Sequence, residues 1–209
     1  MPDVLGHPLA FALRHPRRVA NNRRHVHDSA LAHRRLDGLR GLEIGGAAHN
    51  DFHLDTINAD RFGSLDTVFK AEELRACGRA MAVDVVAPGD RLPFAGDSVD
   101  FVLASHVIEH FPDPIAALEE WRRVARRVIV LVVPHRDRTF DRDRPLTPLA
   151  ELVERHATGF ASDEDRHWSV WTLATFTELC DHLRLPVLDA LDPDDKTGIG
   201  FMVALDASG

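Results

Sequence analysis

The chain of 209 residues has few cysteines, few lysines and no long hydrophobic run. Its two cysteines, Cys77 and Cys180, form neither a disulfide framework nor a metal-binding pattern, which is typical of a protein in a reducing compartment. No stretch approaches the roughly 18 consecutive apolar residues of a membrane-spanning helix, and the first residues lack the core and cleavage site of a signal peptide. We therefore expect a cytoplasmic protein with no membrane span.

The basic residues are almost all arginines, and they are unevenly distributed along the chain. Only two of the 25 are lysines, a bias typical of GC-rich bacterial genomes. Residues 1–41 carry a net charge of +5, whereas the whole chain carries −8, so the remainder is strongly acidic. Nucleic-acid binding depends on clustered cations, so the acidic body argues against a broad nucleic-acid interface. We expect the basic segment, residues 1–40, to be helical.

The remaining composition is that of a globular protein, with 44% apolar and 28% charged residues. Five β-rich runs alternate with helical or charged stretches, at residues 41–45, 55–60, 81–86, 99–105 and 127–133. The continuous apolar run "VIVLVV" in the fifth is typical of a strand covered on both faces, and hence of a parallel sheet. The best helices are residues 114–125, with Asp113 as the cap, and a segment capped by Thr172.

Two further strands, in "PVLDAL" and "IGFMVALD", are joined by the turn-rich "DPDDKTG" and suit an antiparallel hairpin. The sequence thus predicts an α/β fold with a doubly wound, mostly parallel seven-stranded sheet and an antiparallel C-terminal hairpin. Residues 41–209 form this domain. Within it, residues 134–170 look like a long irregular insertion, and loops of that length often carry function. We expect this insertion and residues 1–40 to cover an acceptor.

Acidic residues occur in the first three strands, with Glu43 at the end of the first, Asp60 at the end of the second and Asp84 within the third. Ligands of doubly wound sheets bind beyond the carboxyl ends of the strands. A single acid in such a place more often solvates a loop. All three together, beside the paired glycines of "LEIGG", favour a site that accepts hydrogen bonds from ribose hydroxyls and an adenine amino group.

The segments "LEIGG" and "DRLPFAGDSVDFVLASHVIEHFPDPIAALEEWRRVARRVIVLVVP" resemble the class I S-adenosylmethionine-dependent methyltransferases. The resemblance covers roughly residues 41–134 and implies the Rossmann-like methyltransferase fold with S-adenosyl-L-methionine as cofactor. "PHRDRTFDRDRPLTPLAELVE" is similar to a bacterial subset of these enzymes from glycan and natural-product pathways.

The resemblance implies cofactor contacts at six residues: Glu43, Gly45, Gly46, Asp60, Asp84 and Val85. The first three would meet the methionine and ribose portions, Asp60 the ribose hydroxyls, and the last two the adenine. The sequence departs from the family in three ways. The usual third glycine is missing, only about ten residues separate the glycines from the second strand, and Asp84 stands earlier relative to "LPF" than the usual adenine-binding acid.

Histidines gather after the fourth strand, where "HVIEH" places His106, Glu109 and His110 on one face of a helical turn. His135 follows the fifth strand, and His167 precedes the helix capped by Thr172. Two functional interpretations stay open, beside a purely structural one. In the first interpretation, one histidine acts as a general base, and the candidates are His106, His110, His135 and His167. In the second, a divalent metal is bound by His106, Glu109, His110 and His167.

The metal interpretation is similar to the metal-dependent 2′-O-methyltransferases that act on small-RNA 3′ ends. His106 stands where that family has a glutamate. The sequence as a whole predicts a methyltransferase that transfers a methyl group from S-adenosyl-L-methionine to a hydroxyl of a small molecule, such as a sugar or natural product. The alternatives are an RNA 2′-O-methyltransferase, which the acidic body opposes, and a non-catalytic binding module with the same fold.

Overall fold

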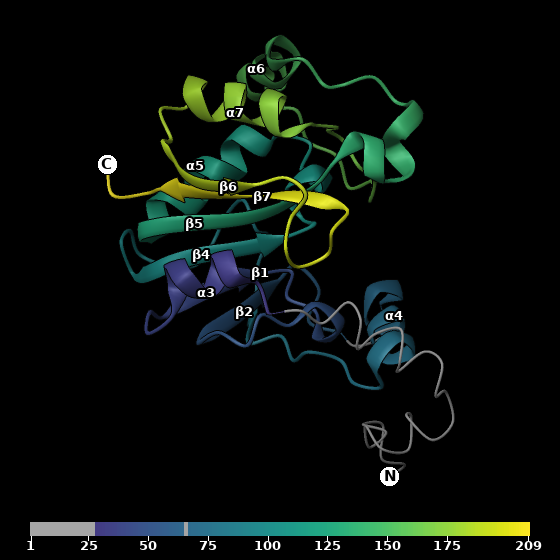
Figure 1. Cartoon of the computed structure of the whole chain (residues 1–209), viewed down its shortest axis with the longest axis vertical. Helices are drawn as coiled ribbons and strands as arrows, with labels where there is room; N and C mark the ends of the chain where they lie inside the picture. Colours follow the sequence, from purple (N-terminus) through teal and green to yellow (C-terminus); the bar gives the residue numbers. More distant parts are fainter. Residues whose placement is uncertain (1–27, 65–66) are drawn as a thin grey trace.

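The computed structural model describes residues 28–64 and 67–209 (Figure 1). Seven strands form one sheet in the order β3-β2-β1-β4-β5-β7-β6. They are β1 (Gly41–Ile44), β2 (Thr56–Asp60), β3 (Val85–Val86), β4 (Val99–Ser105), β5 (Ala125–Pro134), β6 (Val187–Leu191) and β7 (Gly200–Asp206). The first five pair in parallel, and β7 runs antiparallel to both of its neighbours. This confirms the predicted sheet and its C-terminal hairpin.

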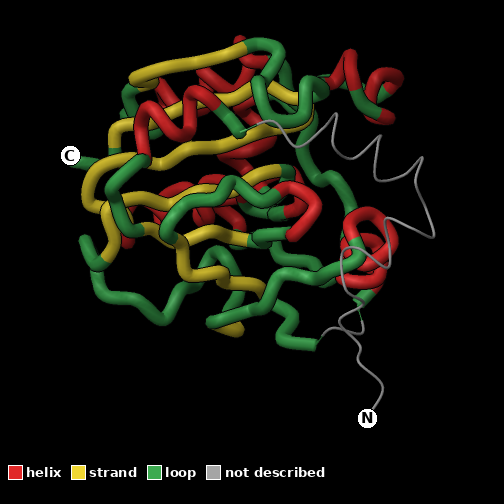
Figure 2. Tube along the Cα trace, turned by 60° about the horizontal axis from the view of Figure 1, so that its bottom comes forward, coloured by secondary structure: helices red, strands yellow, loops and turns green. Residues whose placement is uncertain are grey.

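Helices cover both faces of the sheet (Figure 2). They are α3 (Ala30–Leu36), α4 (Val68–Cys77), α5 (Pro114–Val124), α6 (Leu149–Thr158) and α7 (Leu173–His182), with short 3-10 turns η1 (Ala48–Asn50), η2 (Ile108–His110), η3 (Arg136–Arg138) and η4 (Phe140–Asp143). Successive residues of β4 point to opposite faces. Phe101 therefore packs with α3, whereas Val102 packs in the cluster that contains α5 and α7.

The two helices expected from the sequence form with the predicted caps and within two residues of the predicted ends. Asp113 caps α5, accepting a hydrogen bond from the amide of Ala116 (3.0 Å), and Pro114 occupies its first turn. Thr172 caps α7, where its hydroxyl and that of Thr175 form a reciprocal capping box.

Three features differ from the expectation. β3 is limited to two residues, because Asp84 and the residues before it hydrogen-bond as a loop beside β2. α4 lies between β2 and β3, where no helix was predicted. The insertion contains α6, which starts after Pro148 and ends at Gly159 with a left-handed φ of 63°. Prolines and charges around α6 hide its apolar face in the sequence.

The N-terminal segment is described only from residue 28. Residues 1–27 of the predicted 1–40 segment lie outside the described residues. In the rest, Ser29 caps α3, whose Leu31, Ala32 and Leu36 are fully buried against β4, β5 and β7. Within residues 28–64 and 67–209, no helix has the length and apolar content to cross a membrane.

The carboxyl ends of β1, β2, β4 and β5 meet at one edge of the sheet because these strands run parallel. In Figure 1 the arrow of β4 points to this edge, and α4 lies on the same side. The connection from β1 to β2 contains only the short turn η1, so no helix covers that crossover. The predicted site residues are distributed along this edge.

Candidate active site

The turn after β1 depends on both of its glycines for packing. Gly45 has a φ of +66°, and a Cβ atom there would lie 2.9 Å from the side chain of Val107. A Cβ atom on Gly46 would lie 2.8 Å from Asn58 Oδ1 and 2.9 Å from Met81 Sδ. The Gly46 amide donates to the same Asn58 oxygen (3.0 Å). Ala47, the first residue after the paired glycines, has a φ of −133° that any residue adopts.

A buried ion pair from α4, which was not predicted, supports this turn. Lys70 Nζ lies 2.6 Å from Glu73 Oε1, and both side chains are almost fully buried. The Lys70 ammonium also donates to the Gly46 carbonyl (3.4 Å), while Glu73 Oε2 accepts from the amides of Ala48 (2.9 Å) and Met81 (2.7 Å). Lys70 and Glu73 have the i, i+3 spacing at which side chains meet on a helix, but this spacing is informative only once the segment is known to be helical.

The three acids at the strand ends have different surroundings. Glu43 is 4% exposed and accepts a hydrogen bond from the Thr56 hydroxyl (3.2 Å); burial raises the pKa of its carboxyl to about 7. Asp60 is half-buried at the end of β2, and its Oδ1 accepts from the amide of Phe62 (2.9 Å). Asp84 accepts from the backbone amide of Asn58 (2.8 Å), so its carboxylate links the loop before β3 to β2. Val85 is the first residue of β3.

These residues fit an adenosyl group at Asp60. Its carboxylate is partly exposed and accepts only the Phe62 amide within the described part of the chain, which leaves acceptor capacity for ribose hydroxyls. The Gly46 side of the turn is filled by Asn58 and Met81. A Cβ atom on Gly46 would also lie 3.0 Å from Glu43 Cδ, so the buried carboxyl of Glu43 packs beside the turn.

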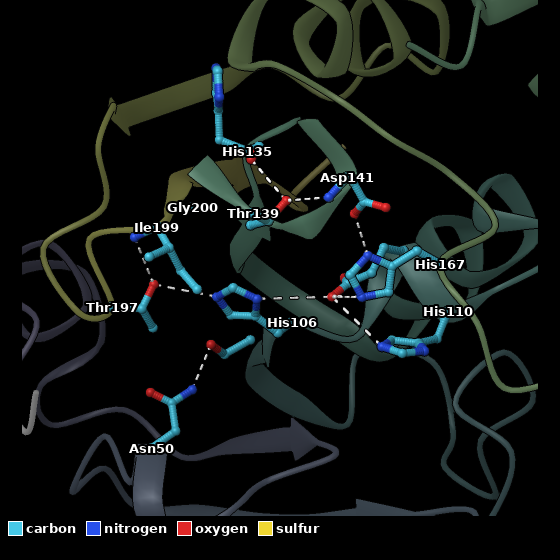
Figure 3. A network of polar contacts seen from close by, with 12 residues as sticks. Asn50, His106, His110, His135, Thr139, Asp141, His167, Thr197, Ile199 and Gly200 are labelled. Carbon is cyan, nitrogen blue, oxygen red and sulfur yellow. Dashed lines mark hydrogen bonds and ion pairs between the residues drawn. The ribbon is translucent and has the colours of Figure 1, made fainter. Parts of the chain in front are cut away.

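The second group of polar residues lies beyond β4. His106 follows the strand with a left-handed φ of +55°, a conformation that costs a non-glycine residue about 1 kcal/mol or more. The 3-10 turn η2 then brings Glu109 between His106 and His110, and His167 reaches the same point from the insertion. Figure 3 shows the rings of His106, His110 and His167 pointing toward one another. The structure therefore brings together the four residues proposed from the sequence as metal ligands.

Glu109 occupies the centre of this group, which we call the histidine cluster (His106, Glu109, His110 and His167). Its Oε1 lies 3.8 Å from Nε2 of His110, 3.8 Å from Nε2 of His167 and 4.0 Å from Nδ1 of His106. These distances exceed hydrogen-bond length. The side chain is 1% exposed, and neither carboxylate oxygen has a hydrogen-bond partner in the described structure.

In each imidazole, the nitrogen that does not face Glu109 contacts a second side chain. His167 Nδ1 lies 2.5 Å from Asp141 Oδ2, and His110 Nδ1 lies 2.9 Å from Asp165 Oδ1. His106 Nε2 lies 3.3 Å from the Thr197 hydroxyl, which is held in turn by Asp194. Carboxylate partners fix both the tautomer and the orientation of an imidazole. Asp141 and Asp165 were not predicted from the sequence, because they contact histidines 26 and 55 residues away.

Burial shifts the protonation of the histidine cluster toward its neutral forms. It raises the pKa of the Glu109 carboxyl to about 8 and lowers the pKa of His106 to about 4. The pKa of His110 is also lowered, by burial and then by the neighbouring His167. Neutral imidazoles are the forms that accept protons or coordinate metals.

His135 lies apart from the histidine cluster. It forms an isolated bridge with Trp171, its Nδ1 accepts from the Asp137 amide (3.1 Å), and its ring points away from the other histidines in Figure 3. Burial lowers the pKa of its imidazole. A role of His135 in catalysis stays a prediction.

An open groove of about 560 Å³ adjoins the histidine cluster. Its lining comes from α4, from η2 and largely from the insertion: Phe69, His110, Phe140, Asp141, Arg144, Asp165, Arg166 and His167. Phe140 is 77% exposed and its ring lies 4.6 Å from that of His167. The groove thus combines aromatic surface, two guanidinium groups and the edge of a polar cluster, a combination suited to a small ligand.

Comparison with known proteins shows what part of this chain is similar to. Residues 63–132 match the methyltransferase domain family, a segment that includes β3, β4, the histidines of "HVIEH" and α5. An uncharacterized methyltransferase of Mycobacterium avium (strain 104) is 47% identical over 58 residues, which are 26% of this chain and 23% of that protein. The same values hold for a relative from Mycolicibacterium paratuberculosis (strain ATCC BAA-968 / K-10). The chain thus aligns with about a quarter of the length of these curated relatives.

Solved structures share the fold over nearly the whole chain. A putative methyltransferase of Haloferax volcanii, solved in complex with the Trm112 methyltransferase activator, has a TM-score of 0.55 at 17% identity, covering 95% of this chain and 96% of that one. A possible histamine N-methyltransferase of Thermotoga maritima has a TM-score of 0.54 at 17% identity, covering 96% and 99%. Together, these comparisons show that residues 63–132 are similar to the methyltransferase domain family and that the chain shares the fold of solved methyltransferase structures.

Proposed function

We propose that the protein transfers a methyl group from S-adenosyl-L-methionine to a hydroxyl group of a small molecule, such as a sugar or a natural product. The observation that carries this proposal is the position of the histidine cluster. It lies at the carboxyl end of β4, the strand next to β1 and its glycine turn, and opens to a groove of ligand size. Acceptor and cofactor sites on neighbouring strand ends are what an in-line transfer requires.

The residues proposed to hold the cofactor lie along β1, β2 and β3. Asp60 accepts the ribose hydroxyls, and Glu43 with the Gly45–Gly46 turn contacts the methionine and ribose portions. Asp84 and Val85 belong to the adenine end, where the carboxylate of Asp84 is already hydrogen-bonded to Asn58. Asp60 is therefore the strongest member of the set, since its carboxylate keeps free acceptor capacity.

The bound cofactor supplies an electrophilic methyl group on a sulfonium. The work left to this chain is to align the acceptor hydroxyl, to exclude water and to receive the hydroxyl proton. Imidazole nitrogens of His106, His110 and His167 are available for the proton, because carboxylates or a hydroxyl occupy the opposite ring nitrogens. Phe140 and Phe69 supply apolar surface at the groove.

The insertion contributes most of the groove lining, which supports its proposed role in covering the acceptor. Arg144 and Arg166 favour an acceptor that also carries a carboxylate, phosphate or polyhydroxyl group. An RNA acceptor is less well supported, since the net charge of the whole chain is −8 and phosphate binding needs a basic surface. A cytoplasmic location stays a prediction.

Calorimetry with S-adenosylhomocysteine tests the cofactor site. We expect binding by the full chain, weakened about 10- to 100-fold by Asp60→Ala, because hydrogen bonds to a charged group contribute about 1.5–3 kcal/mol. Asp181→Ala, on the exposed side of α7, is the control and should bind as the wild type does. No heat with the wild type would favour the non-catalytic module, and equal binding by the Asp60 variant would overturn the assignment of Asp60.

Transfer of a labelled methyl group to small hydroxylated acceptors, compared with RNA 3′ ends, tests the acceptor class. Label in the small molecules supports the proposal. Label only in RNA would replace it with the RNA methyltransferase.

A further inference from the structure

Glu109 is buried without any of the partners that a buried carboxylate requires. Its side chain is 1% exposed, and both carboxylate oxygens lack a hydrogen bond in the described structure. Buried carboxylates in proteins are paired with donors or cations, or they coordinate metals. Among residues 28–64 and 67–209, no arginine or lysine pairs with Glu109, and its ion-pair neighbours are histidines at 3.8–4.0 Å.

The tautomers of these histidines exclude ordinary hydrogen bonds to Glu109. When Nδ1 of His167 donates to Asp141, and Nδ1 of His110 donates to Asp165, each Nε2 carries a lone pair directed at Glu109 Oε1. Lone pairs of two imidazoles and a carboxylate oxygen then face one another. Such an arrangement is repulsive unless a proton or a cation lies between the atoms.

The spacing matches a metal site. One ligand atom from each of Glu109, His110 and His167 can be chosen so that all lie within 4.8 Å of one another. Ligands at about 2.0–2.2 Å from a common cation are about 3–4 Å apart, so the observed distances need only small side-chain adjustments. Nδ1 of His106, at 4.0 Å from Glu109 Oε1, offers a fourth position.

The orientation of the rings provides an independent indication. Histidines that bind metals usually donate their second ring N–H to a carboxylate or another acceptor, which fixes the ring and makes it a stronger ligand. Asp141 and Asp165 do this for His167 and His110, and Thr197 contacts His106. The side chain of Asp141 is itself nearly buried and accepts from Arg144 (2.6 Å), so the outer contacts form a continuous support.

We propose that His106, Glu109, His110 and His167 bind one divalent transition-metal cation. The donor set of three imidazoles and one carboxylate suits borderline cations such as Zn²⁺ or Fe²⁺ better than Mg²⁺, which prefers oxygen ligands. His110 and His167 also line the groove beside Phe140 and Arg144, so a bound cation would lie next to it. If the proposed function holds, an acceptor hydroxyl on the cation would be oriented and made more acidic, and the cation would then replace the imidazoles in activating it.

Direct metal binding tests the site without any assay of activity. Tag-free full-length protein is treated with a chelator, dialysed and titrated with Zn²⁺, Mn²⁺ and Mg²⁺ alone, using calorimetry and elemental analysis. We expect one Zn²⁺ per chain, bound more tightly than Mn²⁺ and far more tightly than Mg²⁺. Absence of binding by all three cations, or preference for Mg²⁺, would overturn the proposal.

Three variants identify the ligands. Glu109→Gln keeps the volume of the buried side chain and removes its charge, and His167→Gln removes one imidazole; each should abolish stoichiometric Zn²⁺ binding. Asp141→Asn, which acts through His167, should weaken binding about 10- to 100-fold. Unchanged affinity in the Glu109 and His167 variants would overturn the proposal.

His156→Gln is the matched control. His156 also lies between two carboxylates, Asp113 (2.9 Å) and Glu119 (3.9 Å), but 39% of its side chain is exposed. Its substitution should leave Zn²⁺ binding unchanged. A fall as large as that of His167→Gln would mean that binding is an unspecific property of surface histidines, and would overturn the site.

One further titration distinguishes failure of the metal site from failure of the cofactor site. Metal-free wild-type protein and Glu109→Gln should both bind S-adenosylhomocysteine, because Glu43 and Asp60 belong to other strands. Zn²⁺ binding without S-adenosylhomocysteine binding would leave the metal site in place and remove the proposed function. The reverse result would remove the metal site alone.

Discussion

The two polar regions at the edge of the sheet differ in how far they satisfy their own groups. At the turn after β1, glycine faces are filled by Asn58 and Met81, and the charges of Lys70 and Glu73 are paired and hydrogen-bonded. In the histidine cluster, Glu109 is as deeply buried as that pair and has no hydrogen bond. Equal burial with unequal pairing indicates that the charges of the first region contribute to stability, whereas the carboxylate of Glu109 costs stability unless the proposed cation is bound.

Removal of Lys70 should produce the largest effect. Lys70→Ala leaves Glu73 buried without its cation, and breaking a buried pair in this way costs about 3–5 kcal/mol of unfolding free energy. Denaturant unfolding measures it. Arg40→Ala removes an ion pair with Asp55 that is exposed on both sides and should cost less than about 1 kcal/mol. Similar costs for the two variants would contradict the contrast between the regions.

Glu43 should make stability depend on pH. Its pKa is raised from 4.5 to about 7, mainly by burial and further by Asp51, against the opposing effects of Lys196 and Lys70. The unfolded chain ionises this carboxyl at lower pH than the folded chain does. The free energy of unfolding should therefore fall between about pH 4.5 and pH 7, by up to about 3 kcal/mol from this group.

Glu43→Gln removes that contribution. Unfolding measured at pH 5 and pH 7.5 should show a smaller decrease for the variant than for the wild type. Parallel curves would mean that Glu43 is not stabilised in its protonated form, and that the turn is more open to solvent than its packing indicates.

Gly46→Ala tests whether the turn is filled by the protein itself. The added methyl group would lie within 3.0 Å of Asn58 Oδ1, Met81 Sδ and Glu43 Cδ, and overpacking of this kind costs about 1–3 kcal/mol. Met81→Ala combined with Gly46→Ala should recover part of the loss relative to the sum of the single variants. Additive costs would argue against the Met81 contact.

Glu109→Met should show the smallest effect, with the opposite sign. Replacing an unpartnered buried carboxylate by an apolar side chain of similar length should stabilise the metal-free protein by about 1 kcal/mol. Zn²⁺ at 100 times its dissociation constant should instead stabilise the wild type by about 2.7 kcal/mol and leave the variant unchanged. Thermal unfolding with and without Zn²⁺ measures both effects, and destabilisation of the metal-free variant would contradict the contrast.

The sequence was informative wherever the signal was local. Alternation of strands and helices, the cap at Asp113 and the turn before β7 rest on neighbouring residues, and the seven strands formed as expected. The grouping of Glu109 with His110 was also readable, because the two are adjacent. α4 and α6 were missed, since their apolar faces are short and interrupted by charges.

Long-range contacts account for the other unpredicted parts of the site. Asp141 and Asp165 reach the histidine cluster only because the insertion folds back over the end of β4. The same holds for the contact of Met81 with Gly46, and for the assignment of Asp84 to a backbone hydrogen bond with Asn58. None of these pairs has a spacing in the sequence that indicates a contact.

The order of apolar, turn and capping residues alone determined the doubly wound sheet, because local hydrophobic periodicity and hydrogen-bonded caps decide which segments become strands and helices. The tertiary structure alone decided which polar groups are satisfied. Burial and pairing depend on side chains brought together from distant segments, so only the folded chain distinguishes the carboxylate of Glu73, which has its cation, from that of Glu109, which has none.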